Sequence, residues 1–400
     1  MANLVRSIPR RTSNLLRSSV SSSTASLSSY TGPSSTDGRG YDHGAIDVHT
    51  HCYLPRYMEM LRNRTDVPYV CPGKSDADDE RYVILPGEDA EDTTAIGRPI
   101  GEEYFDVGQK IRYMDRHGID VSVLSLANPW LDFLPAEDAV AMAKLLNDDL
   151  QEISEGSNGR IYGFGVLPTQ DPEASCKEIE RLASEDCSKV KGVILGTSGA
   201  GNGLDDPALE QVYSALAEND MPVFLHPHYG VGNSHFDGTG HSLFLALGFP
   251  FETTVATSRL ILSGAFDRHP KLRLLLAHSG GTLPFLAGRL DSCVEHDHEM
   301  CDKLERAPSS YLKEHFWYDS VIYHTPALKS VCDLVGSDKL MYGTDNPFFP
   351  PKEGARSDKE WPSTSKNYDA IDGMVGEDVR NDIVWGNASR LLGIEPIHQK

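Results

Sequence analysis

The segment AIDVHTH at residues 45–51 ends a short apolar run with two histidines, His49 and His51. Three later segments share this design, an apolar run that ends in a histidine or an aspartate: VFLHPH at 223–228, LLLAHSGG at 274–281 and LMYGTD at 340–345. In a β/α barrel, the catalytic side chains lie at the carboxyl ends of the strands. The four segments therefore predict a single site at one rim of a barrel.

Short apolar runs alternate with longer helix-like segments from residue 45 onward. Asp171-Pro172 and Asp206-Pro207 are typical helix starts, because aspartate caps a helix and proline suits its first turn. The alternation predicts a closed (β/α)8 TIM barrel. An open, doubly wound sheet is the alternative, but it gives no reason for all the polar ligands to share one rim. The predicted strands are 45–50, 121–126, 161–167, 191–196, 222–227, 272–278, 317–323 and 339–344.

The connection between the first two predicted strands, residues 52–110, far exceeds the roughly 15 residues beyond which connections become uncommon. Long connections of this kind are usually functional. This one begins at the carboxyl end of the first strand, on the rim that carries the predicted site. We therefore expect a capping insertion after the first strand. It carries four arginines: Arg62, Arg64, Arg81 and Arg98.

The first 36 residues contain four arginines and twelve serines, with no lysine and no acidic residue. This composition is typical of a mitochondrial transit peptide, and a disordered extension without an address is the alternative. The predicted organisation is a disordered extension over 1–40 and a barrel domain over 41–400. The expected location is cytoplasmic or mitochondrial.

The formal charge of −22 argues against a nucleic-acid or anionic-membrane surface, but not against a small anionic substrate. No stretch approaches the roughly 18 apolar residues that a membrane span needs. The seven cysteines form no CxxC pair, as expected for reduced thiols of an intracellular protein. Cys52 follows His51 directly and is expected to face the opposite side of the strand, in packing.

His49 and His51 are two residues apart, so both should face the interior of the barrel. Asp345 follows the eighth predicted strand, which adjoins the first in a closed barrel, and His226 comes from the fifth. Three imidazoles and one carboxylate favour one zinc ion, with manganese as the alternative. His278 is expected to be a catalytic group beside the metal, although a fifth ligand is also open.

Two types of residue are absent from the segments of the predicted site, and their absence narrows the range of possible reactions. The fourth predicted strand ends in ILGT at 194–197, with no lysine or acid to bridge a second metal, so a mononuclear site follows. No glutamate follows closely after His226, whereas base deaminases use one to move protons. The role of His228 stays open between packing and contact with the edge of a substrate.

The residues resemble the amidohydrolase superfamily, in its branch of aminocarboxymuconate-semialdehyde decarboxylase-like enzymes, and within that branch the fungal uracil-5-carboxylate (isoorotate) decarboxylases. The resemblance runs through nearly the whole predicted barrel. Asn346 departs from the pattern, which has a histidine directly after the aspartate. The segments that carry the resemblance are DVHTH (47–51), SLANPW (125–130), GVILGTS (192–198), FLHPHYG (224–230), ALGFP (246–250), LAHSGGTLPFLAGR (276–289) and GTDNPFFPP (343–351).

This resemblance implies a zinc site and a small set of residues that bind the substrate. His278 matches the family's histidine next to the metal shell. Arg98, Asn128 and Phe348 match substrate-contacting positions. The metal ligands of the family match His49, His51, His226 and Asp345.

The implied reaction is a non-oxidative decarboxylation of uracil-5-carboxylate to uracil and CO₂, without an organic cofactor. Zinc would chelate the carboxylate and the neighbouring carbonyl oxygen, and Asp345 would protonate C5 with support from His278. Arg98 offers a bidentate cation, Asn128 a hydrogen-bonding amide and Phe348 a stacking face. The expected partner is a small anionic aromatic or pyrimidine carboxylate, with neither nucleic acid nor membrane, and the chain is expected to form a homodimer or homotetramer.

Three alternatives stay open at this point. A decarboxylase of a hydroxybenzoate or resorcylate-type acid would offer the metal the same pair of neighbouring oxygens. A metal-dependent lactone or amide hydrolase would use the same ligands with a water aimed at a carbonyl. A non-enzymatic binding module is the third. Release of CO₂ from an aromatic acid without added cofactor separates the first from the other two.

Overall fold

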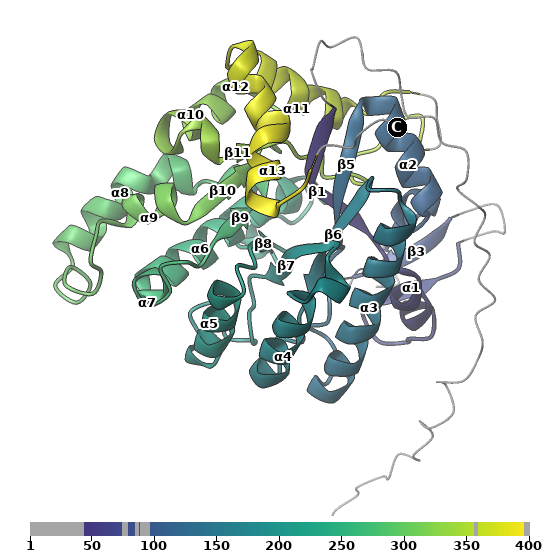
Figure 1. The fold of residues 1–400 in the computed structure, drawn as a ribbon, viewed down its shortest axis with the longest axis horizontal. Coiled ribbons are helices and arrows are strands. Elements are labelled where there is room, and N and C mark those ends of the chain that lie inside the picture. Colours follow the sequence, from purple (N-terminus) through teal and green to yellow (C-terminus); the bar gives the residue numbers. More distant parts are fainter. Residues whose placement is uncertain (1–43, 74–78, 85–87, 89–96, 356–358, 396–400) are drawn as a thin grey trace, which may run out of the picture. The chain divides into compact units, whose positions relative to one another are not determined.

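A (β/α)8 barrel forms the part of the chain that the computed structural model describes, residues 44–73, 79–84, 88, 97–355 and 359–395. Its strands make one parallel sheet in the order β1-β5-β6-β7-β8-β9-β10-β11, and helices surround it (Figure 1). A parallel bridge between Thr50 and Asn346 joins β1 to the chain after β11, so the barrel is nearly closed. The predicted fold is confirmed. The strands are β1 (Ala45–Cys52), β5 (Ile119–Leu126), β6 (Ile161–Val166), β7 (Val190–Gly196), β8 (Val223–His226), β9 (Leu274–Leu276), β10 (Phe316–Asp319) and β11 (Leu340–Met341).

The last three strands are shorter than the apolar pattern predicted, and β9 covers only Leu274–Leu276 of the predicted 272–278. β10 ends at Asp319, because the carboxylate of Asp319 accepts the backbone N–H of Val321 and thereby turns the chain out of the sheet. β11 ends at Met341, so Asp345 lies in the loop that follows rather than at the end of the strand. Asp345 has a φ of 60°, a left-handed conformation that is uncommon for an aspartate.

The helices begin and end where local chemistry favours it. Asp171 accepts the N–H of Ala174 and caps α4, and Asp206 does the same for Ala208 in a short 3-10 turn. Both capping predictions are confirmed. The helices are α1 (Pro55–Arg62), α2 (Val107–His117), α3 (Ala136–Gly156), α4 (Pro172–Leu182), α5 (Glu210–Glu218), α6 (Phe249–Leu262), α7 (Ala265–Arg268), α8 (Leu283–His296), α9 (Pro308–Glu314), α10 (Thr325–Val335), α11 (Pro362–Asp372), α12 (Glu377–Asn381) and α13 (Asn387–Leu392).

The long connection after β1 contains a small antiparallel sheet of β2 (Tyr69–Cys71), β3 (Glu80–Val83) and β4 (Arg98–Ile100). Three of its four arginines hold the insertion itself together: Arg62 pairs with Glu80, Arg64 donates to the Pro68 carbonyl, and Arg81 donates to the Gly97 carbonyl. The fourth, Arg98, has no such hydrogen bond or ion pair of its side chain with the described residues. The predicted insertion is confirmed, and Arg98 is the arginine available for another purpose.

Within the described residues, no helix combines the length and the apolar character needed to cross a membrane. All seven cysteines are free thiols, and Cys52 is buried, as a packing role requires. The predicted extension over 1–40 lies outside the described residues.

Candidate metal centre and active site

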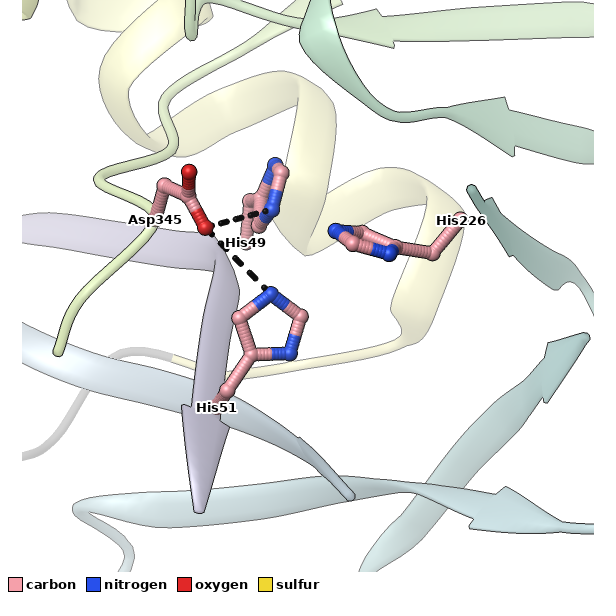
Figure 2. A group of neighbouring side chains, drawn as sticks. All are labelled: His49, His51, His226 and Asp345. Carbon is pink, nitrogen blue, oxygen red and sulfur yellow. Dashed lines mark ion pairs between the residues drawn. The ribbon is translucent and has the colours of Figure 1, made fainter. Parts of the chain in front are cut away.

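His49, His51, His226 and Asp345 meet inside the barrel, and one donor atom from each lies within 4.8 Å of the others. Figure 2 shows the three imidazole rings and the carboxylate facing a common centre. Asp345 Oδ1 lies 3.3 Å from His49 Nε2 and 3.5 Å from His51 Nε2. All four residues are buried. Three nitrogen donors and one oxygen donor form a candidate site for a single divalent ion.

Strand alternation delivers the histidines. Along β1, His49 and His51 face the interior together because side chains alternate at every residue. Along β8, the same alternation turns Phe224 and His226 inward. The Phe224 ring lies 5.0 Å from the His49 ring and 5.8 Å from the His226 ring, so it forms an apolar floor beneath the cluster.

Asp345 reaches the cluster through the seam between β1 and the chain after β11. Its backbone N–H donates to the His49 carbonyl at 2.7 Å, and the N–H of His51 donates to the Asn346 carbonyl at 2.8 Å. Asp47 accepts from the backbone N–H and the hydroxyl of Thr344. These bonds hold residues 344–346 against β1. The position of Asp345 therefore does not depend on the two-residue strand β11.

Asp319 orients His49. His49 Nδ1 lies 2.5 Å from Asp319 Oδ2, and the same carboxylate accepts the backbone N–H groups of His278 and Ser279. A carboxylate on one ring nitrogen fixes the tautomer and turns the other nitrogen toward a metal. His49 Nε2 is buried without a hydrogen-bond partner in the described structure, as a metal-binding nitrogen would be.

Acceptors hold the other two imidazoles in the same way. Ser125 gives its hydroxyl proton to the Thr50 carbonyl, so its oxygen is free to accept from His51 Nδ1, 2.9 Å away. His226 Nδ1 lies 2.7 Å from the Pro227 carbonyl, which can only accept. Each Nδ1 therefore keeps its proton, and each Nε2 keeps a lone pair for a metal. The donor set therefore fits a divalent ion.

Burial sets the charge states of the ligands. Burial lowers the pKa of His51 to about 4 and that of His226 well below its usual range, so both rings are neutral at pH 7. Burial also opposes the charge on His49, but Asp345 and Asp319 outweigh it and raise the pKa of His49 to about 10. Burial acts to raise the pKa of Asp345, but His49 and His278 hold it well below its usual value.

Asp319→Asn should weaken metal binding by about 10- to 100-fold. The substitution replaces a carboxylate oxygen by an amide nitrogen, which would face backbone N–H groups, and the side chain would no longer hold His49. Competition between the enzyme and a chromogenic chelator would measure the change in Kd. Asp382→Asn is the matched control, since that carboxylate pairs with Arg390 at the surface. Equal metal affinity in Asp319→Asn and wild type would show that Asp319 does not tune the site.

The purified protein should contain about one equivalent of divalent metal per chain. The reason is that four donors meet at one centre, and that the carboxyl end of β7, residues 194–196, carries no acidic or basic side chain. Elemental analysis of protein prepared without chelator would measure the stoichiometry. Two tightly held equivalents, or a protein that is fully active without metal, would contradict this expectation.

His278 lies beside the cluster. Its ring is 5.1 Å from the His49 ring and 5.2 Å from the His226 ring, and its Nε2 is 3.8 Å from Asp345 Oδ2. Asp345 thus turns one oxygen toward His49 and His51 and the other toward His278. His278 adopts a left-handed φ of 54°, held by the bonds of its backbone to Asp319.

A cavity of about 140 Å³ adjoins the cluster. Phe249 joins the two, because it lines the cavity while its ring lies 6.2 Å from both His226 and His278. Arg98 and Asn128 line the cavity, as substrate-binding residues should. The remaining lining residues include Ile84 and Glu88 of the insertion, His228, and His241, Phe244 and Leu245 near α6.

Phe348, the third residue expected to bind substrate, lies between the cluster and Arg98. Its ring is 5.6 Å from the His51 ring, and the Arg98 guanidinium lies 5.5 Å from its centre. Among the described residues, no hydrogen bond or ion pair engages Arg98. An arginine placed over an aromatic face and left without an anion is suited to bind an anionic ligand.

Sequence reasoning missed several residues that hold the site. Asp319 could have been found, because an acidic residue within an apolar strand must have a partner. Lys110 is another: it is buried, and its Nζ donates to Thr50 Oγ1 at 2.6 Å and to the Asn346 side chain. This contact turns the side chain of Asn346 toward Lys110. No local signal marks Ser125 or Glu252, whose partners are distant in the sequence.

Comparison with known proteins places these features in context. The sequence profile of the family described as Amidohydrolase matches residues 46–394. The chain is 30% identical over 363 residues to 2-amino-3-carboxymuconate-6-semialdehyde decarboxylase of Dictyostelium discoideum, covering 88% of this chain and 92% of that protein.

Solved structures give a similar result. The apo structure of Metarhizium anisopliae IDCase matches with a TM-score of 0.83 and 42% identity, covering 89% of this chain and 98% of that one. A dihydroxybenzoic acid decarboxylase from Polaromonas sp. JS666, with bound manganese and the inhibitor 2-nitroresorcinol, shares the fold at a TM-score of 0.67. Its identity is 24%, and the match covers 88% of this chain and 97% of that one.

Proposed function

Because this chain belongs to the amidohydrolase family, in its branch of 2-amino-3-carboxymuconate-6-semialdehyde decarboxylase-like enzymes, we propose that it decarboxylates uracil-5-carboxylate (isoorotate) to uracil and CO₂. At the coarser level the chain is a metal-dependent decarboxylase with a site of three histidines and one aspartate. The choice of substrate is supported by the 42% identity to an IDCase, an isoorotate decarboxylase, over nearly the whole of both chains.

One observation carries the proposal. The candidate metal site adjoins a cavity that presents a guanidinium, Arg98, without an anionic partner in the described structure, and an amide, Asn128. Such a cavity is complementary to a flat ring that bears a carboxylate and hydrogen-bonding groups. The overall charge of −22 does not exclude an anionic substrate, since a guanidinium can bind an anion through local charge-assisted hydrogen bonds.

The residues around the cavity have separate roles in binding the metal and the substrate. A divalent ion bound by His49, His51, His226 and Asp345 would supply a Lewis acid that anchors neighbouring oxygens of the substrate. Zinc is proposed, because three imidazoles favour it, and manganese is the alternative that a relative of the same fold binds. Arg98 binds the anion, Asn128 binds the ring, and Phe348 covers one face of the ring. No organic cofactor is part of the proposal.

Asp345 is the proposed proton carrier. Its Oδ2 faces His278 at 3.8 Å, away from the imidazoles of the metal site, so the ionised carboxylate can receive a proton from His278 and pass it to the substrate. The proton forms the new C–H bond at C5. The bond between C5 and the carboxylate then breaks, its electron pair restores the ring double bond, and CO₂ leaves. One proton is consumed and no electron is gained or lost.

A substrate panel tests the proposal. The metal-loaded enzyme is given uracil-5-carboxylate, 2,4-dihydroxybenzoate, 2,6-dihydroxybenzoate and a lactone, and both CO₂ release and hydrolysis are followed. We expect CO₂ from uracil-5-carboxylate with the highest kcat/KM. CO₂ from a hydroxybenzoate alone would overturn the pyrimidine assignment and leave the decarboxylase. Lactone hydrolysis without CO₂ release would overturn both.

We also propose that residues 1–40 lie outside the catalytic barrel, because every candidate site residue comes from position 49 onward. Deleting them should leave kcat and KM for uracil-5-carboxylate within about twofold of the full-length values. Thermal unfolding of both forms would check that the shortened chain is folded. A large loss of turnover in a folded, metal-loaded deletion variant would assign the segment a part in building the site.

A further inference from the structure

Lys110, in α2, is a buried cation that forms no ion pair with the described residues. It is only 3% exposed, although a lysine is almost never buried without a charged partner. Its Nζ donates to three uncharged oxygens: Thr50 Oγ1 at 2.6 Å, the Asn346 carbonyl at 3.4 Å and the side-chain oxygen of Asn346. Burying an unpaired charge is costly. The position of Lys110 therefore requires an explanation other than packing.

The Lys110 side chain is an ammonium group at neutral pH. Burial lowers the pKa of Lys110 to about 8, and the nearby carboxylate of Asp47 opposes this effect. An ammonium group has three N–H donors and no acceptor. The three oxygens of Thr50 and Asn346 receive these donors, so the hydrogen-bonding capacity of Lys110 is spent on two residues.

Those two residues form the seam between the ligand strand and the ligand loop. Thr50 lies between the two histidine ligands of β1, so its side chain points away from the metal site. Its hydroxyl donates to the Asn346 carbonyl at 3.0 Å, which leaves the oxygen able to accept from Lys110. Asn346 directly follows Asp345 in the chain. One ammonium group thus joins β1 to the loop of Asp345, from the side opposite the metal site.

We propose that Lys110 is a positioning residue of the metal centre, which clamps the loop of Asp345 to β1 and so holds that carboxylate among the imidazoles; this inference rests on the proposed function. Lys110 does not line the substrate cavity, so it acts through Asp345. A loop held less firmly lets the carboxylate move relative to the metal and to His278. Both metal affinity and proton transfer should therefore depend on Lys110.

Lys110→Met tests the inference, because methionine is nearly as long as lysine and carries no charge. The Thr50 hydroxyl and the Asn346 carbonyl keep their bond to each other. The Asn346 side chain lines a second cavity, of about 50 Å³, in which water can replace the ammonium group. Replacing a buried charge by an apolar chain is often neutral or stabilising, so the unfolding temperature of the metal-free variant should not fall.

The metal centre of Lys110→Met should nevertheless be impaired. Competition with a chromogenic chelator should give a metal Kd about 10-fold weaker than that of wild type. At saturating metal, kcat for CO₂ release from uracil-5-carboxylate should fall by about 10-fold, whereas KM should change by less than about twofold. This difference is expected because Arg98 and Asn128 line the substrate cavity and make no contact with Lys110 in the described structure.

A double-mutant cycle shows whether Lys110 acts through Asn346. Asn346→Ala removes the amide that accepts from Nζ and should weaken metal binding by itself, which keeps the test open if Lys110→Met does not fold. Both substitutions break one contact, so the metal Kd of the double variant should lie within about threefold of that of the weaker-binding single variant. Arg112→Met is the matched control: Arg112 is exposed, belongs to the same helix and lines the same second cavity. It should match wild type in metal Kd and in kcat.

Three outcomes overturn the inference while the proposed function stands. The first is a metal Kd and a kcat of Lys110→Met within about threefold of the wild-type values. The second is a rise in KM as large as the fall in kcat, and the third is a double variant in which the two single effects multiply. A wild type that binds metal but releases no CO₂ from uracil-5-carboxylate overturns the proposed function itself, and the metal Kd still tests the role of Lys110.

Discussion

Asp345→Asn should reduce the release of CO₂ from uracil-5-carboxylate on the order of 10³-fold or more. The substitution removes an anionic donor from the cluster and also the proposed proton carrier. Asp345 Oδ1 faces His49 and His51, whereas Oδ2 faces His278, so the two roles reside on different oxygens of one carboxylate. Initial rates of CO₂ release, measured beside metal content, would quantify the loss.

The metal measurement separates the two roles of Asp345. If the variant loses its metal and excess zinc restores binding but not turnover, proton transfer is the missing function. Asp382→Asn changes a surface carboxylate that pairs with Arg390, and this variant should retain full activity. If Asp345→Asn keeps its metal and near-normal turnover, the proton must come from another group, and His278 is the first candidate.

Arg98→Ala should raise KM for uracil-5-carboxylate and lower kcat/KM, at a cost of about 2–4 kcal/mol of transition-state binding. The guanidinium lines the cavity, and no anion of the described structure neutralises it, so its loss removes a charge-assisted contact with the substrate. Steady-state kinetics over a wide range of substrate concentrations would measure both constants.

Arg62→Ala is the control for Arg98→Ala, because Arg62 belongs to the same insertion but pairs with Glu80 at the surface. It should change kcat/KM by less than about twofold. Arg98→Lys should recover only part of the loss, since an ammonium group lacks the planar fork that binds a carboxylate through two bonds. Full activity in Arg98→Ala would remove Arg98 from substrate binding.

The sequence was sufficient for those features that depend on local periodicity. Alternation along β1 places His49 and His51 on one face of the strand. The same rule along β8 places Phe224 and His226 on one face. Eight apolar runs separated by helix-like segments predicted the barrel, and the length of the segment after β1 predicted the insertion. The bounds of β9, β10 and β11 were wrong. In β10, the side chain of Asp319 accepts the backbone N–H of Val321 and ends the strand early.

The arrangement around the ligands depended on tertiary structure alone. Asp319 bonds to His49 across 270 residues, Ser125 to His51 across 74, and Asn128 to His228 across 100. No periodic pattern links such residues, because each pair forms only when distant strands meet at the rim of the barrel. The sequence by itself determined which side chains reach that rim. The closed barrel decided which nitrogen of each metal-site imidazole is left free, because this depends on partners that only the folded chain brings within hydrogen-bonding distance.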